Sequence, residues 1–192
     1  GIYNNFSDSI VSTTGAMGKF KFINDSIVAT FRDHQVEIKE LRDGMKHLSA
    51  MGKESNLTFT DQLGILATLN DHLIKSGIAG RSTQSMLSKI AKTPIAFAKA
   101  FEIQIDPMVP IDLISILEQV KKKLGEGALT ASQVGTIFNR LGLRGAKTFI
   151  TLVKYVDELK ENIQKLKDQS GDAASEMADI MLDKPDVAFA RM

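Results

Sequence analysis

The chain has 192 residues, of which 43% are hydrophobic, and a formal net charge of +1. These values favour a soluble globular chain of one or two domains and argue against a disordered polyelectrolyte or a general nucleic-acid binder. No cysteine is present, which excludes disulfides, thiolate metal sites and a cysteine nucleophile, and suits a reducing compartment. The longest run without Asp, Glu, Lys or Arg, residues 127–139, is shorter than the ~20 residues of a membrane-spanning helix. Because the chain begins with Gly and carries no secretory signal, we expect a fragment of a longer parent.

Apolar residues recur at helical spacing along most of the chain and rarely alternate with polar ones. The sequence therefore predicts an all-α fold of amphipathic helices, about eight to ten in number. Helix starts are marked by Thr60, or alternatively Thr58 with Asp61, and by Thr130 with Gln133. Four glycines that follow apolar runs mark helix ends: Gly52, Gly77, Gly125 and Gly142. The expected helices cover residues 4–14, 20–33, 36–51, 60–76, 80–92, 94–101, 111–124, 130–141, 144–169 and 172–182.

The segment 102–110 (EIQIDPMVP) is the one extended candidate, because its two prolines bias the preceding residues away from helix. We expect it to be a Pro-containing loop or hinge between two antiparallel helical halves. The N-terminal half then covers residues 1–101. The C-terminal half covers residues 111–192 and contains the long helix 144–169.

Residues that carry chemistry do not form a recognisable site. The three histidines, His34, His47 and His72, lack a second ligand at the spacing that would place two on one helix face, which argues against a metal centre. No Gly-x-Ser-x-Gly motif occurs. The GLRG run at 142–145 imitates a loop of some RNA-binding modules, but a helix precedes it and no sheet adjoins it, so we interpret it as a tight interhelical turn. We therefore expect no catalytic residue, no cofactor and no sequence-specific nucleic acid.

The basic residues between His72 and Phe101 include three that share one side of a predicted helix: Arg81, Lys89 and Lys92. Met86, Leu87 and Ile90 share the opposite side. An ordinary solvated face explains this basic face in most amphipathic helices. The functional alternative is docking on an acidic surface.

The most regular apolar spacing, 3, 4, 3, 4, 3, is a heptad seam formed by Phe149, Leu152, Val156, Leu159, Ile163 and Leu166. The seam is shorter than the ~3–4 heptads that indicate a coiled coil, so packing inside the chain is the favoured interpretation and self-association the alternative. We expect the first three residues to belong to the core and Ile163 and Leu166 to project past the bundle.

Three stretches together, 58–101, 110–124 and 129–153, resemble the core region of phage tail tape measure proteins. The resemblance depends on the order of its parts: a small-residue turn from Gly77 to Gly80 and then Met86, a Pro-containing loop, an Ile/Leu-rich helix with a Lys run, Ile137 and Phe138, and then Gly142, Arg144, Gly145 and Ala146. The segment EMADIMLDKP (176–185) also resembles this region, and the likeness spans about Lys19 to Pro185. The chain is much shorter than a complete member of that family.

The resemblance implies a structural protein of a tailed phage or prophage that occupies the tail tube lumen and sets tail length. It also implies assembly in the bacterial host cytoplasm, tail tube and tail tip proteins as partners, several copies side by side, and an acidic tube wall opposite the basic face. It carries over no catalytic residue. Two other functions remain open from the residues: a helical adaptor that binds a partner helix in an apolar groove, and, third, an enzyme with one essential Glu hidden among helices.

Overall fold

The computed structural model describes residues 15–52, 55–125 and 129–169. Every regular element in these ranges is an α-helix, and none of the described residues forms a strand, so the predicted all-α fold class is confirmed. The helices are α2 (Gly15–His34), α3 (Ile38–Gly52), α4 (Phe59–Asp71), α5 (Ser76–Lys92), α6 (Pro94–Phe101), α7 (Leu113–Leu124), α8 (Ala131–Lys154) and α9 (Val156–Gln169). The helices expected at 4–14 and 172–182, and the segment 176–185, lie outside the described residues.

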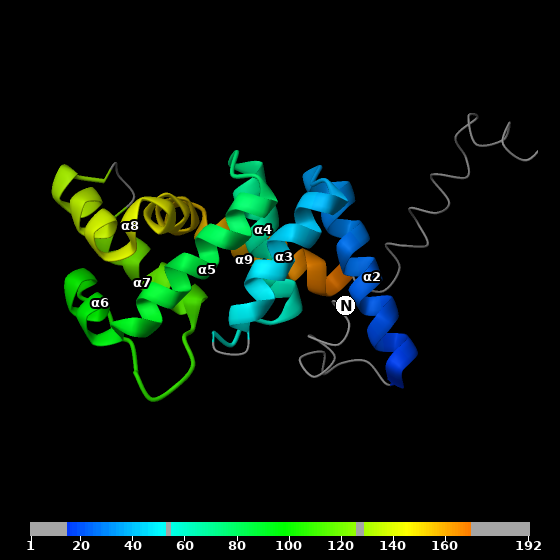
Figure 1. Ribbon diagram of the computed structural model, residues 1–192, viewed down its shortest axis with the longest axis horizontal. Helices are drawn as coiled ribbons and strands as arrows, with labels where there is room; N and C mark the ends of the chain where they lie inside the picture. The colour runs from blue at the N-terminus through cyan, green and yellow to red at the C-terminus, as the bar shows by residue number, and fades with distance from the viewer. Residues whose placement is uncertain (1–14, 53–54, 126–128, 170–192) are drawn as a thin grey trace, which may run out of the picture.

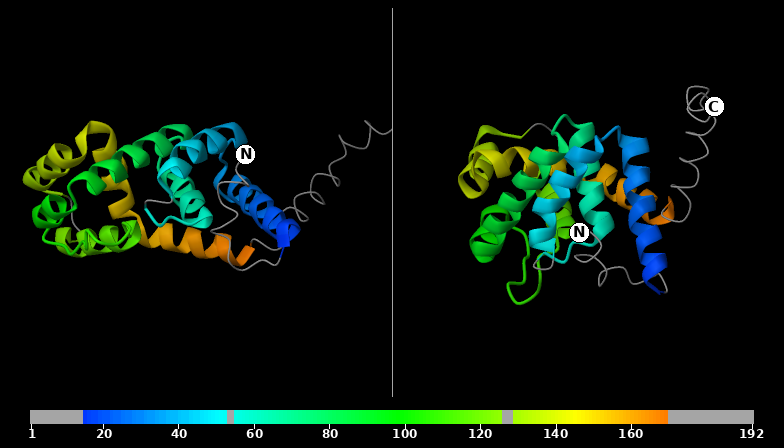
Figure 2. Two further views of the ribbon diagram at one scale, coloured as in Figure 1. Left: turned by 60° about the horizontal axis from the view of Figure 1, so that its bottom comes forward. Right: turned by 45° about the vertical axis from the view of Figure 1, so that its right-hand side comes forward.

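The helices form an elongated bundle with α6, α7 and α8 at one end and α2 at the other (Figure 1). Helix α5 runs from the middle of the molecule towards the first of these ends, and α9 passes along α4 and reaches α2 (Figure 2). Two helices that follow the segment 102–110 thus pack on helices that precede it: α8 packs on α5, and α9 packs on α4 and α2. The two sides of the segment 102–110 therefore share one apolar core, which includes Phe59, Phe97 and Phe149.

Capping boxes mark the first residues of two helices, α4 and α8. Thr58, rather than Thr60, caps α4: its Oγ1 accepts from the backbone N–H of Asp61 at 3.2 Å, and Asp61 Oδ2 accepts from the N–H of Thr58 at 2.9 Å. Thr130 and Gln133 form the same reciprocal pair at the start of α8, as predicted. Each cap provides partners for backbone N–H groups that the helix itself leaves unpaired.

The segment 102–110 is irregular, without strand structure, and it is fastened to α7. The backbone N–H of Gln104 donates to Gln119 Oε1 at 2.9 Å, and Gln119 Nε2 donates to the Gln104 carbonyl at 3.2 Å. Asp106 Oδ1 accepts from the N–H of Met108 at 2.8 Å and closes a local turn near Pro107. The loop is thus tied to the neighbouring helix by a two-way amide contact.

Candidate functional site

The first predicted small-residue turn, Gly77 to Gly80, is not a turn. Gly77 is the second residue of α5 and does not have a positive φ, so the expected helix end at this glycine is wrong. The preceding helix already ends at Asp71, and Leu73, with φ 64°, takes the left-handed conformation instead. The amide of Ile74 then donates to the Leu69 carbonyl at 2.8 Å, which closes the end of α4 without a glycine.

Gly80 has a different role, because it lies where α3 and α5 cross. A Cβ atom at this position would lie 2.6 Å from Gly44 Cα and 2.7 Å from the Gly44 carbonyl carbon, and closer still to its oxygen. A Cβ atom at Gly44 would in turn lie 2.5 Å from the Ser76 carbonyl oxygen. Two glycines facing each other thus allow the two helix backbones to approach at a distance that no side chain would permit.

The second motif, Gly142, Arg144 and Gly145, contains the predicted helix end. Gly142 has φ 66° and ψ 172° and breaks α8 into two segments. Arg144 is exposed on the second segment, and Gly145 is buried against Met86 of α5, with 3.4 Å from its potential Cβ to Met86 Cα. The Gly142 turn is therefore a helix kink that brings the second segment of α8 onto α5.

Only part of the predicted basic face is free. Lys89 is half-buried, and its Nζ donates to the Leu141 carbonyl at 2.7 Å, directly before the kink at Gly142. A backbone carbonyl at a helix break lacks its usual intrahelical partner, and a cation provides one. Arg81 and Lys92 are exposed. Lys89 thus supports the kink, and Arg81 and Lys92 alone remain available for contact with another molecule.

The heptad seam lies in the core along its whole length. All six side chains are buried: Phe149, Leu152, Val156, Leu159, Ile163 and Leu166. The expectation that Ile163 and Leu166 project past the bundle is wrong, because α9 packs along α4, where Ile163 Cγ1 lies 2.5 Å from the position of a Cβ on Gly64. Self-association through this seam would require the bundle to open.

The long helix expected at 144–169 is interrupted at Tyr155, which separates α8 from α9. Tyr155 has φ −112° and ψ 28°, and its ring stacks on His72 with centroids 3.4 Å apart and planes 8° from parallel. The apolar spacing continues through this residue, since Leu152 and Val156 are both buried. Periodicity alone therefore gives no signal of the break, and the ring that stacks on Tyr155 belongs to a residue 83 positions earlier in the chain.

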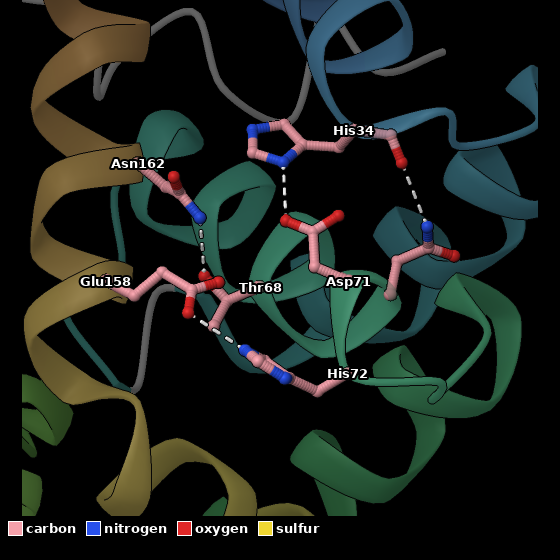
Figure 3. Close-up of polar contacts among 7 residues, drawn as sticks. His34, Thr68, Asp71, His72, Glu158 and Asn162 are labelled. Carbon is pink, nitrogen blue, oxygen red and sulfur yellow. Dashed lines mark hydrogen bonds and ion pairs between the residues drawn. The ribbon is translucent and has the colours of Figure 1, made fainter.

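A polar cluster around this break joins three helices (Figure 3). His72 Nε2 lies 2.9 Å from Glu158 Oε2, Asn162 Nδ2 donates to Thr68 Oγ1 at 3.0 Å, and His34 Nδ1 lies 2.7 Å from Asp71 Oδ2. Asn162 and Thr68 are both buried, so their hydrogen bond removes the cost of two unpaired polar groups in the core. No local pattern in the sequence indicates these pairs, because their members are 37 to 94 residues apart.

Exposed ion pairs connect α7 to α9. Lys121 Nζ donates to Asp157 Oδ2 at 2.6 Å, and Lys160 Nζ donates to Glu118 Oε1 at 2.5 Å. The hydrogen bond and charge of Lys121 lower the pKa of Asp157, and those of Glu118 raise the pKa of Lys160. Surface pairs of this kind orient neighbouring helices and contribute little stability.

The described parts of the chain contain neither a metal-binding cluster nor a membrane-spanning helix. No group of three His, Asp or Glu side chains in residues 15–52, 55–125 and 129–169 could hold a metal ion. Among the eight helices described above, none is both long enough and apolar enough to cross a membrane.

Comparison with known proteins gives one family. The sequence model of a family described as phage-related minor tail protein matches residues 3–142, which is more than half of the chain. No curated protein and no solved structure matches the chain. The match ends at the Gly142 kink and includes both glycines of the α3–α5 crossing. The chain therefore belongs to the phage-related minor tail protein family and is a structural component of a phage tail.

Proposed function

We propose that this chain is the core region of a tape measure protein, which occupies the tail tube lumen and sets tail length. Membership of the minor tail protein family carries the proposal, because it places the chain in a phage tail. The order of the sequence parts from Gly77 to Ala146 adds the likeness to tape measure proteins in particular. Helices suit a molecular ruler, since each residue adds a fixed rise of ~1.5 Å along the axis.

In this function the chain is a non-enzymatic packing element of the virion tail, assembled in the host cytoplasm. Its partners are tail tube and tail tip proteins, and the exposed Arg81 and Lys92 provide positive charge towards an acidic tube wall. Weak contacts of this kind are sensitive to salt and allow a chain to slide. Purified protein is expected to show no turnover of peptidoglycan.

Tail length in the parent phage tests the proposal. Helix-forming insertions of about 30 and about 60 residues after Gln169 should lengthen the tail by about 45 and about 90 Å, if each residue adds ~1.5 Å along the tube. Electron microscopy of negatively stained virions measures both values. Deletions of equal size in the same region should shorten the tail.

The graded pair of insertions provides the control, because a general assembly defect would not scale with insert length. Virions of unchanged tail length with both inserts present in the particles would refute the tape measure role. That result would favour the helical adaptor, whose function does not depend on the length of its chain.

A further inference from the structure

A groove lies between α5 and α8. It has a volume of about 650 Å³, and apolar side chains from both helices and from the α4–α5 turn line it. Three of them are large hydrophobic residues that face solvent: Leu73 is 91% exposed, Ile78 55% and Leu143 75%. Exposed apolar side chains gathered around one groove are a feature of interaction sites.

The groove has a rigid floor. Ser82 and Thr148 are buried there, and Thr148 Oγ1 donates to Ser82 Oγ at 2.6 Å, which fixes α8 against α5. On one rim, Leu73 is held outward by a backbone with φ 64°, a conformation that bulky residues rarely adopt. On the other rim, Leu143 directly follows the kink at Gly142. The position of the groove thus depends on a hydrogen bond between α5 and α8 and on the backbone conformations at Leu73 and Gly142.

The charged side chains that line the groove, among the described residues, all carry positive charge. They are Arg81, Arg144 and Lys147, and no Asp or Glu belongs to the lining among the residues that the structure describes. All three cations are exposed, and no carboxylate within the described ranges of the chain forms an ion pair with them. Arg81 Nε donates to the Gly77 carbonyl at 3.3 Å. A binding partner with carboxylates would therefore meet cations that no described carboxylate of the chain neutralises.

We propose that this groove binds an amphipathic helix of another protein that carries acidic residues beside its apolar face. The apolar lining favours a helix with Leu, Ile or Met at helical spacing over a bare polyanion such as nucleic acid. The cationic rim selects acidic flanks over basic ones. This inference does not depend on the tape measure role, because the groove would serve any tail protein that docks here.

A peptide of about 18 residues, with Leu at every third or fourth position and Glu beside the Leu stripe, serves as the probe for the intact chain. Fluorescence anisotropy should show saturable binding that weakens as salt rises from about 0.05 to about 0.5 M. The matched peptide with Lys in place of Glu should bind at least about tenfold more weakly. Absence of saturable binding by the Glu peptide, or equal binding of both peptides, would overturn the proposal.

Variants of the chain assign the binding to the groove. Leu143→Ser and Ile78→Ser should each lower the affinity for the Glu peptide at least about fivefold, since both side chains line the groove and are exposed in the free chain. The double variant Arg144→Glu with Lys147→Glu should bind the Lys peptide more tightly than the Glu peptide. Ile95→Ser is the matched control, because Ile95 is 69% exposed on α6 outside the groove. Circular dichroism of each variant verifies folding.

A duplex DNA oligonucleotide provides the last arm of this experiment. It should not displace the Glu peptide, because it offers phosphates without an apolar face. If DNA displaces the Glu peptide, and still does so from Leu143→Ser, the cations alone bind anions without the apolar lining. That result would overturn the proposal. Unchanged peptide binding by Leu143→Ser, Ile78→Ser and the charge-reversed variant together would overturn it as well.

Discussion

Helix α5 presents two very different faces. Gly80 and Ser76 face α3, where backbone lies against backbone. Ile78, Arg81 and Ser82 lie on the opposite side at about 100° per residue, and they line the groove. Neighbouring residues of one short segment therefore either pack closely against α3 or line the groove.

The difference between these faces teaches which residues carry stability and which are available for function. The closed face depends on missing side chains, and any added atom must separate two helices. The open face presents the exposed side chains of Ile78 and Arg81, which lie outside the apolar core, whereas Ser82 on the same face is buried and bonds to Thr148. Substitutions on the two faces should therefore give opposite patterns in stability and in binding.

The largest expected effect is that of Gly80→Ala. The new Cβ atom would meet the backbone of Gly44, which cannot move without displacing α3, so we expect a loss of about 3 kcal/mol or more in the free energy of unfolding. Urea denaturation followed by circular dichroism measures the loss. A change below about 1 kcal/mol would show that the α3–α5 crossing is looser than described.

The next effect concerns the kink that supports one rim of the groove. Gly142→Ala should cost about 1–2 kcal/mol, because a Cβ is strained at φ 66° and would also collide with Lys89 Nζ. Lys89→Met should cost about 1 kcal/mol through the lost hydrogen bond to the Leu141 carbonyl. Because both substitutions act on the same contact, the double variant should lose less stability than the sum of the losses in the two single variants. Strict additivity in thermal unfolding would contradict the capping role of Lys89.

Gly77→Ala should have a small effect of the opposite sign. Gly77 is helical, and the nearest atom to its potential Cβ is Asp43 Cβ at 3.9 Å, so alanine should stabilise the fold by about 0.5 kcal/mol. The variant is a matched partner for Gly80→Ala, three residues away on the same helix. A loss of more than about 1 kcal/mol would instead support the helix end at Gly77 that the sequence suggests.

The comparison of Gly77 with Gly142 also shows how far the sequence predicts the fold. Both glycines follow apolar runs, yet only Gly142 has a positive φ. At the end of α4 the left-handed position is taken by Leu73, a residue type that gives no such signal. Fold class and the cap at Thr130 were predictable because they depend on local spacing and chemistry.

The functional surfaces were less predictable, because they depend on residues distant in sequence. Helix position groups Lys89 with Arg81, but the carbonyl that Lys89 binds lies 52 residues later in the chain. Arg144 and Lys147 join Arg81 only when the second segment of α8 packs on α5. The ring of Tyr155 at the break between α8 and α9 likewise stacks on His72, which is distant in sequence. Such contacts require the tertiary structure.

The smallest expected effect belongs to the exposed ion pair of Lys121 and Asp157. It tests whether a surface contact contributes as little to stability as the open face of α5. Lys121 lowers the pKa of Asp157 in the folded chain below its ordinary value of 3.8. A carboxyl group with a lowered pKa binds protons more weakly when folded, so it stabilises the fold above pH 3.8 and loses this contribution as pH falls through the lowered pKa. Lys121→Met should therefore melt slightly below the unaltered chain at about pH 6, and the two should converge at about pH 2. Lys122→Met is the control, because Lys122 is exposed and forms no ion pair with any described residue. Calorimetric melting curves that differ equally at both pH values would show that Lys121 acts through its alkyl chain rather than through its charge.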